Sequence, residues 1–265
     1  MADQEHMEMD DAKQLLADWI RESESLVVFT GAGVSTESGI PDFRSPGGIW
    51  EKYDPRELTY QKFIADPEVR KIRWKMFMEN DALWKAEPNP AHRAIAELHE
   101  LGKLRAVITQ NIDGLHQDAG VPDDKVVEIH GTGREVYCLS CGARWPSAEI
   151  RDRIEKEDIE IPECTECGGI LKTATISFGQ QMPEHEVRQS EKLSAAADLM
   201  LVIGSTLVVQ PAALMPVITK KSGGKVVIIN VSETEGDFMA DMIIYGKAGE
   251  ILPDVLAKYK RSYAH

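Results

Sequence analysis

The stretch that decides the fold is Leu26-Val-Val-Phe-Thr30, followed at once by Gly31-Ala-Gly-Val-Ser35. A continuous apolar run of this kind, without alternating polar residues, is typical of a strand buried on both faces of a parallel sheet. Small residues directly after such a strand let backbone N–H groups approach a phosphate at the mouth of the sheet. The dinucleotide fingerprint Gly-x-Gly-x-x-Gly is incomplete, because Thr36 occupies its third glycine position. A plain tight turn is therefore the alternative to a nucleotide-binding loop.

Strands of the same type recur along the chain, with helical patterns between them. Further apolar runs lie at residues 106–109, 126–129, 199–203, 225–230 and, as an edge-type strand, 242–245. Helices are predicted at residues 9–22, 91–102 and 184–197. Strands that alternate with helices are characteristic of parallel sheets covered on both faces. The sequence therefore predicts an α/β fold, with a Rossmann-like doubly wound parallel sheet.

Length and charge exclude several classes of protein. The chain has 265 residues, of which 43% are hydrophobic and 28% charged, which suits one sizeable globular core. Its 30 Lys and Arg residues against 44 Asp and Glu give a net charge of −14, which argues against direct binding of nucleic acid. No run reaches the roughly 18 apolar residues of a membrane span, and the acidic start does not look like a signal peptide. We expect a cytoplasmic protein without a membrane partner.

Four cysteines form two Cys-x2-Cys pairs, Cys138 with Cys141 and Cys164 with Cys167, separated by 22 residues. Two such knuckles complete a tetrahedral thiolate site for zinc, although the gap is slightly longer than the usual ~15–20 residues. Disulfides or a redox pair are the alternative, and a cytosolic chain disfavours them. Because the site would use all four cysteines, we expect one closed structural Zn²⁺ per chain and no catalytic thiol.

Polar or small residues follow three other predicted strands at their carboxyl ends. Gln110-Asn111-Ile112-Asp113 follows one strand, Gly204-Ser205-Thr206 follows the next, and Asn230 ends a third. Carboxyl ends of parallel strands meet along one edge of the sheet, so these segments and the glycine loop predict one nucleotide crevice. Amide and carboxylate side chains can bind ribose hydroxyls and a carboxamide there. The alternative is that Asn111 or Asp113 simply caps a helix.

Among seven histidines, His130 is the candidate general base, because it ends the short strand at 126–129 on the same sheet edge. Imidazole titrates near neutral pH, which suits a group that accepts a proton during a reaction.

Taken in order, these segments resemble the sirtuin family of NAD-dependent protein deacylases, over roughly residues 9–261. The resemblance suggests a single-domain member of bacterial or archaeal type. The matching segments are Gly31-Ala-Gly-Val-Ser35, Ser38-Gly-Ile-Pro-Asp-Phe-Arg44, Thr109-Gln-Asn-Ile-Asp113, His130-Gly131, the cysteine pairs, Gly204-Ser-Thr-Leu-Val-Val-Gln-Pro211 and the strand ending at Asn230.

The resemblance implies a division of the chain. Residues 9–44, 101–133 and 173–261 would form the Rossmann-like NAD-binding domain. A smaller helical and zinc-ribbon module would be made of a helical insert at 45–100 and a zinc ribbon at 134–172. The acyl-lysine would enter between the two parts, and Phe43 and Arg44 would lie on a mobile loop over the cofactor.

The resemblance also assigns roles to individual residues. Catalysis would involve His130, Asn111 and Asp113. The residues that would bind NAD are Gly31, Ala32, Gly33, Thr36, Phe43, Arg44, Gln110, Asn111, Ile112, Asp113, Gly204, Ser205, Thr206, Asn230, Val231 and Ala248. An extended substrate peptide would pair with the chain at Ile176, Phe178 and Val208.

The implied function is NAD-dependent deacetylation of protein lysines, with release of nicotinamide and formation of O-acetyl-ADP-ribose. Alternatives on the same fold are mono-ADP-ribosyl transfer and removal of long neutral acyl chains. A non-catalytic nucleotide sensor has no need of the base at His130, and the charge disfavours a zinc-ribbon nucleic-acid module.

The helical insert bears on the choice of acyl group. Relatives that prefer acidic acyl groups carry Tyr-x-x-Arg where this chain has Trp74-Lys-Met-Phe77. Two apolar aromatics cannot pair with a carboxylate as Arg does, so acetyl or longer neutral groups are expected over succinyl and malonyl. Two alternatives remain: Trp74 and Phe77 are core residues of a helix, and Arg70 or Arg73 reaches the pocket.

Overall fold

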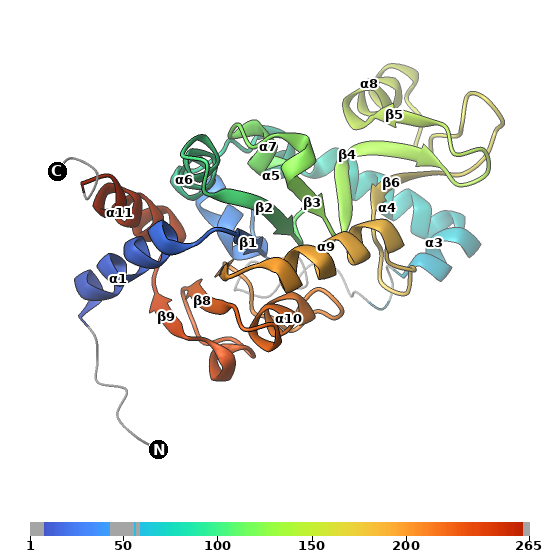
Figure 1. Cartoon of the computed structure of the whole chain (residues 1–265). Coiled ribbons are helices and arrows are strands. Elements are labelled where there is room, and N and C mark those ends of the chain that lie inside the picture. The colour runs from blue at the N-terminus through green and yellow to red at the C-terminus, as the bar shows by residue number, and fades with distance from the viewer. Residues whose placement is uncertain (1–7, 43–55, 57–58, 262–265) are drawn as a thin grey trace.

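The structure is a computed structural model that describes residues 8–42, 56 and 59–261 (Figure 1). Its main element is a six-stranded sheet in the order β3-β2-β1-β7-β8-β9, in which every neighbouring pair is parallel. The strands are β1 (Leu26–Thr30), β2 (Leu104–Thr109), β3 (Val126–Glu128), β7 (Leu199–Ile203), β8 (Lys225–Asn230) and β9 (Met242–Tyr245). The strand order reverses between β1 and β7, which is where ligands bind in open α/β sheets.

Helices cover both faces of this sheet. Side chains of β1 alternate between two apolar cores: Leu26 and Val28 face one, and Val27 and Phe29 face the other. The first core contains residues of α1 (Met9–Glu22), α6 (Pro90–Glu100) and α11 (Ala248–Arg261), and the second lies against α9 (Glu184–Ala196) and α10 (Leu214–Lys221). The predicted doubly wound α/β fold is confirmed.

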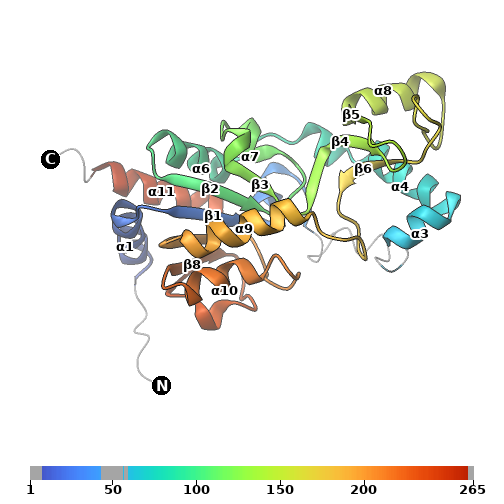
Figure 2. The same cartoon turned by 45° about the vertical axis from the view of Figure 1, so that its right-hand side comes forward.

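A smaller module lies at one end of the molecule (Figure 2). It contains an antiparallel three-stranded sheet in the order β5-β4-β6, with its own core around Trp74, Val136, Ile150 and Leu171. Its elements are α3 (Tyr60–Ala65), α4 (Pro67–Glu79), α5 (Asp81–Lys85), β4 (Gly131–Cys138), β5 (Arg144–Pro146), α8 (Ser147–Glu157) and β6 (Leu171–Thr175).

Two element boundaries differ from the predicted division. The insert predicted at 45–100 includes α6, but α6 packs against α11 and its apolar residues belong to the core of the parallel sheet. The small sheet begins at Gly131 and ends at Thr175, so it extends beyond the ribbon predicted at 134–172. Both differences have one cause: a helix or strand joins the layer that its apolar side chains contact, and sequence position alone does not reveal that layer.

Short elements connect the strands to the site. They are η1 (Ala32–Ser38), α7 (Leu115–Asp118), η3 (Asp123–Lys125) and η4 (Asp237–Met239). None of the helices in the described ranges combines the length and apolar character that a membrane crossing requires.

Candidate active site

The turn after β1 lies directly against the turn after β7. The backbone N–H of Gly33 donates to the carbonyl of Gly204 at 2.8 Å, and that of Gly31 donates to Ile203 at 3.1 Å. A Cβ atom on Gly33 would lie 2.8 Å from the Cα of Gly204, so neither loop tolerates a side chain at this crossing. Gly204 itself has φ +62°, a left-handed conformation that glycine adopts without strain. The two glycine segments predicted to share one nucleotide crevice are therefore brought together.

The segment after β2 joins the same crossing. The Gln110 side-chain amide donates to the Ser205 hydroxyl at 2.8 Å, which links the ends of β2 and β7. The Asn111 amide donates to the Ser35 hydroxyl at 3.0 Å, and Ser35 donates to Asp113 Oδ2 at 2.7 Å. The other carboxylate oxygen of Asp113 accepts from the backbone N–H of Leu115, the first residue of α7, at 3.0 Å. The N-cap position itself is Gly114, so neither Asn111 nor Asp113 is the capping residue of this helix.

His130 follows β3 on the same edge of the sheet. Its Nδ1 lies 3.1 Å from the backbone carbonyl of Gln110. Since a carbonyl only accepts, Nδ1 carries the hydrogen and Nε2 keeps a free lone pair. Burial lowers the pKa of His130 below its usual 6.5, and the hydrogen bond to Gln110 opposes this shift in part. At neutral pH the ring is therefore an uncharged base.

Two buried histidines that sequence reasoning did not single out lie beneath this group. His116 Nε2 is 2.9 Å from the Thr30 hydroxyl, and His92 Nε2 is 3.5 Å from that of Ser35. Burial lowers the pKa of His92 to about 4 and that of His116 to about 3, so both are neutral. Asn89 caps α6 and reaches back to the carbonyl of Val34 at 2.7 Å. The Asn89-Pro-Ala-His92 capping pattern was the sequence signal that could have located this support.

The residues predicted for the adenosine half lie at and after the ends of β7, β8 and β9. Asn230 is buried and donates to the Ser232 carbonyl at 2.8 Å, and Val231 is 70% exposed beside it. Ala248 is buried at the first residue of α11. Thr206 is exposed, and its carbonyl accepts from Glu235 N at 3.1 Å. Phe43 and Arg44 lie outside the described residues.

The predicted peptide-binding residues flank the end of β6 and the turn after β7. Phe178 and Val208 are each about half exposed. Ile176 N donates to the His130 carbonyl at 2.8 Å, and Tyr60 N donates to that of Phe178 at 2.9 Å. The segment that follows β6 is thereby connected both to His130 and to α3.

The four cysteines converge as predicted. One sulfur atom from each lies within 4.8 Å of the others, and the pairs Cys138–Cys167 and Cys141–Cys164 are 3.6 Å apart. A Cβ on Gly169 would lie 2.9 Å from the Cys138 sulfur, so glycine is required for the second knuckle to close. Four thiol groups in this arrangement fit one Zn²⁺ with no open coordination position.

Trp74 and Phe77 pack in and against the core of the small module. Trp74 is buried in the core of the small module, and the two rings pack edge to face at 5.2 Å. The alternative that they are core residues is the one the structure supports. Arg70 donates to the carbonyls of Phe63 and Ile64, so it supports the α3–α4 turn.

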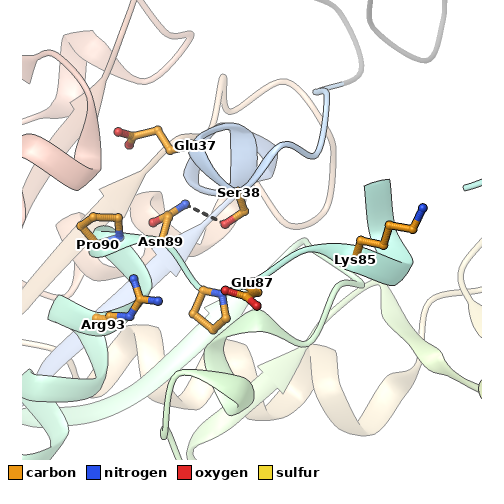
Figure 3. A pocket seen from close by; sticks show the side chains of 8 residues that line it. Glu37, Ser38, Lys85, Glu87, Asn89, Pro90 and Arg93 are labelled. Atoms are coloured by element: carbon orange, nitrogen blue, oxygen red, sulfur yellow. Dashed lines mark hydrogen bonds between the residues drawn. The ribbon is translucent and has the colours of Figure 1, made fainter. Parts of the chain in front are cut away.

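A separate hollow of about 420 Å³ lies between η1 and the start of α6 (Figure 3). Asn89 donates to Ser38 across it at 3.1 Å, and its charged residues are of both signs: Glu37, Glu87, Lys85 and Arg93. None of the predicted site residues lines this hollow.

Comparisons with known proteins agree with this geometry. The family model described as the Sir2 family matches residues 31–211. An NAD-dependent protein deacetylase from Thermodesulfovibrio yellowstonii is 45% identical over 89% of this chain and 91% of its own length. An NAD-dependent protein deacetylase 1 from Bradyrhizobium diazoefficiens is 45% identical over 89% of this chain and 92% of its own.

Solved structures add ligands to the comparison. A Sir2 enzyme with a deacetylated p53 peptide and 3'-O-acetyl ADP-ribose has a TM-score of 0.85 and 38% identity, covering 95% of this chain and 98% of that one. A complex of Sir2 with a p53 peptide and NAD⁺ also has a TM-score of 0.85 and 38% identity, covering 96% and 100%. Sir2Tm bound to a propionylated peptide has a TM-score of 0.83 and 37% identity, covering 95% and 98%.

Proposed function

This chain belongs to the Sir2 family and is an NAD-dependent protein deacetylase, and we propose that His130 is the general base of its reaction. In the overall reaction an acyl-lysine, NAD and water give lysine, nicotinamide and an O-acyl-ADP-ribose. When bound, NAD supplies a ribose carbon that loses nicotinamide and accepts the acyl oxygen. The residues of this chain bind, orient and accept a proton around that carbon.

The observation that carries the role of His130 is its hydrogen bond to Gln110. Because Nδ1 donates to a backbone carbonyl, Nε2 is the nitrogen that can accept a proton from a ribose hydroxyl. The lowered pKa keeps the ring neutral at pH 7. A base positioned in this way accelerates a reaction by about 10²–10⁴-fold.

Asn111 and Asp113 would orient the nicotinamide half of NAD. Asn111 is buried and is held by Ser35, which also donates to Asp113. These hydrogen bonds fix both side chains before a ligand arrives, so little conformational entropy is lost on binding. Gln110 and Ile112 would complete this end of the crevice.

The glycine segments would hold the pyrophosphate and the adenosine. The proposed phosphate contacts come from the turn after β1, and Gly204, Ser205, Thr206, Asn230, Val231 and Ala248 would contact the adenosine half. The close crossing of Gly33 and Gly204 supports this role, because it brings the turns after β1 and β7 together at the edge of the sheet where ligands bind in open α/β folds. Phe43 and Arg44 are also proposed to contact NAD.

Zinc would be structural. The four thiolates of Cys138, Cys141, Cys164 and Cys167 would fill its coordination sphere, so it would stabilise the small module without activating water.

The substrates are peptides that contain an acylated lysine. We propose that the peptide extends along Ile176 and Phe178, which follow β6, and Val208, which lies in the turn after β7. Because Trp74 and Phe77 pack in the small module, the preference for neutral acyl groups is instead supported by the propionylated peptide bound to the similar Sir2Tm structure.

The decisive experiment compares the wild type with His130→Ala and His130→Tyr, using NAD and acetyl-, succinyl- and myristoyl-lysine peptides. Mass spectrometry of the peptide and nucleotide products identifies both the reaction and the acyl preference. Both variants should lose at least about 10²-fold in turnover while NAD still binds, as expected for a lost general base. Full turnover in either variant would remove His130 from the chemistry. Transfer of labelled ADP-ribose onto protein would favour the alternative ADP-ribosyltransferase activity.

A further inference from the structure

Lys172, on β6, is a lysine buried inside the small module. Its side chain is among the largest that are fully buried, with 1% relative exposure. No ion pair with a carboxylate is found for it among the described residues. Its Nζ donates instead to two backbone carbonyls of its own strand, Thr173 at 3.1 Å and Thr175 at 2.5 Å.

Burial of this amine is unfavourable for stability. Desolvation lowers the pKa of Lys172 to about 7, and the neighbouring charge of Arg73 lowers it further. An apolar side chain of similar volume in such a place is often neutral or stabilising. The two hydrogen bonds of the amine offset part of this cost, and they also tie together the carbonyls that they join.

These bonds lie where β6 separates from β4. Thr173 pairs with Val136, and Thr175 pairs with Gly131, so the register shifts between the two pairs. Gly131 has φ +74°, and a Cβ there would lie 2.0 Å from the carbonyl oxygen of Ala174. Regular ladder bonds are interrupted at this irregularity, and the ammonium of Lys172 bridges the carbonyls on either side of Ala174.

The chain that leaves this irregularity is the segment proposed to pair with substrate (Figure 2). Ile176 N donates to the carbonyl of His130 at 2.8 Å, directly after Thr175. Farther along, Gln180 accepts from Ser177 N at 3.1 Å and donates to the Tyr137 hydroxyl at 3.3 Å. The direction in which residues 176–178 run is therefore set by the last residues of β6.

From these contacts we infer that Lys172 is a positioning residue for the acyl-peptide substrate: by bridging the carbonyls of Thr173 and Thr175 it fixes the backbone at Ile176–Phe178. Lys172 itself contacts neither peptide nor NAD. The inference rests on the proposed peptide-binding role of residues 176–178.

The test uses Lys172→Met, which keeps the length of the side chain and removes every donor, with Lys172→Arg as the variant that keeps donors. Lys75→Met is the matched control, because Lys75 lies in the same module, is exposed, and within the described ranges has a single ion pair, to Glu79 at 3.8 Å. Steady-state KM is measured separately for acetyl-lysine peptide and for NAD, together with zinc content and melting temperature.

Lys172→Met should raise the peptide KM by about tenfold, the equivalent of one lost hydrogen bond to a charged group. Its KM for NAD, zinc content and melting temperature should stay at wild-type values, as should every property of Lys75→Met. Lys172→Arg should restore most of the peptide affinity. A merely structural role would instead lower the melting temperature and change both KM values together.

An unchanged peptide KM in Lys172→Met would overturn the inference. If Lys172→Met does not fold, the peptide KM values of Lys172→Arg and Lys172→Gln are compared instead. Lys172→Gln, whose side chain is shorter and has fewer N–H donors, should have the higher peptide KM. Equal values reject the inference. Failure of the proposed function would look different, because the wild type itself would then release no nicotinamide with any acyl peptide.

Discussion

At the scale of single residues, the candidate site depends on which atoms of each residue are already hydrogen-bonded and which can still contact a ligand. His130 uses Nδ1 for a backbone carbonyl, which leaves Nε2 for the role of base proposed above. Ser35 accepts from Asn111 and donates to Asp113, so one hydroxyl orders two side chains that are proposed to contact NAD. At Gly33 and Gly204 the functional property is the absence of a side chain.

The substitution Gly33→Ala tests that last point. Its Cβ would lie 2.8 Å from backbone atoms of Gly204, which cannot rotate away, so both loops must move. We expect destabilisation of about 1–3 kcal/mol, the usual cost of overpacking, together with a raised KM for NAD. Thermal melts and steady-state kinetics measure the two effects.

Gly120→Ala is the control for this variant. Gly120 has φ +110° and nothing within 4 Å of its Cβ position, so alanine there is strained without touching the site. It should lower the melting temperature and leave the KM for NAD unchanged. If Gly33→Ala behaves in the same way, the crossing of the two loops has no part in NAD binding.

At the scale of elements, the small module is a sheet whose end is closed by the two cysteine knuckles. Its apolar core includes Cys138 and Cys164 beside Trp74, Val136 and Leu171. A small sheet of three strands buries little apolar surface, so a metal that links β4 to the loop before β6 supplies much of its stability.

Replacing Cys164 by serine should therefore release zinc and unfold this module alone. We expect amides of residues 131–175 to lose protection against hydrogen exchange while β1 and β7, in the core of the parallel sheet, stay protected. Zinc content is read with a colorimetric chelator, and exchange by mass spectrometry. Ser140→Ala, which lies in the other knuckle between Cys138 and Cys141 and removes no ligand sulfur, should keep both zinc and protection. Uniform loss of protection over the whole chain would contradict a local role for the metal.

At the scale of the whole molecule, the parallel sheet brings distant segments to one edge while burying titratable groups beneath it. His92 comes from α6 and His116 from α7, and their rings lie 5.0 Å apart. Both have a pKa below 6.5 in the folded state because of burial. Protonation of either ring therefore favours unfolding.

The sign of the pH dependence follows from these shifts. Below pH 6.5 these histidines bind protons in the unfolded chain but not in the folded chain. The stability that they contribute above pH 6.5 is therefore lost as the pH falls. The loss is complete near pH 4 for His92 and near pH 3 for His116, which are their pKa values in the folded state. Glu128, whose pKa burial raises to about 7, opposes part of this slope between its usual 4.5 and 7. Since two histidines outweigh one carboxyl, the net free energy of unfolding should fall on acidification.

The variant His116→Gln isolates the larger contribution. It removes one titrating ring and keeps a group that can bond to Thr30. Denaturant unfolding measured from pH 7 to pH 4 should show a shallower loss of stability than in the wild type. Parallel pH curves for the two proteins would show that His116 is protonated equally in both states.

The sequence alone determined the buried strands, their alternation with helices, the four zinc ligands and the edge of the sheet where the site lies. It could do so because apolar periodicity, cysteine spacing and small residues after strands are local patterns. Only the tertiary structure decided which layer α6 joins, that Trp74 faces a core, that Nε2 of His130 is the free nitrogen, and that Lys172 turns its amine onto its own strand. Those properties depend on contacts between segments far apart in the chain, and burial, hydrogen bonding and pKa arise only when such segments meet.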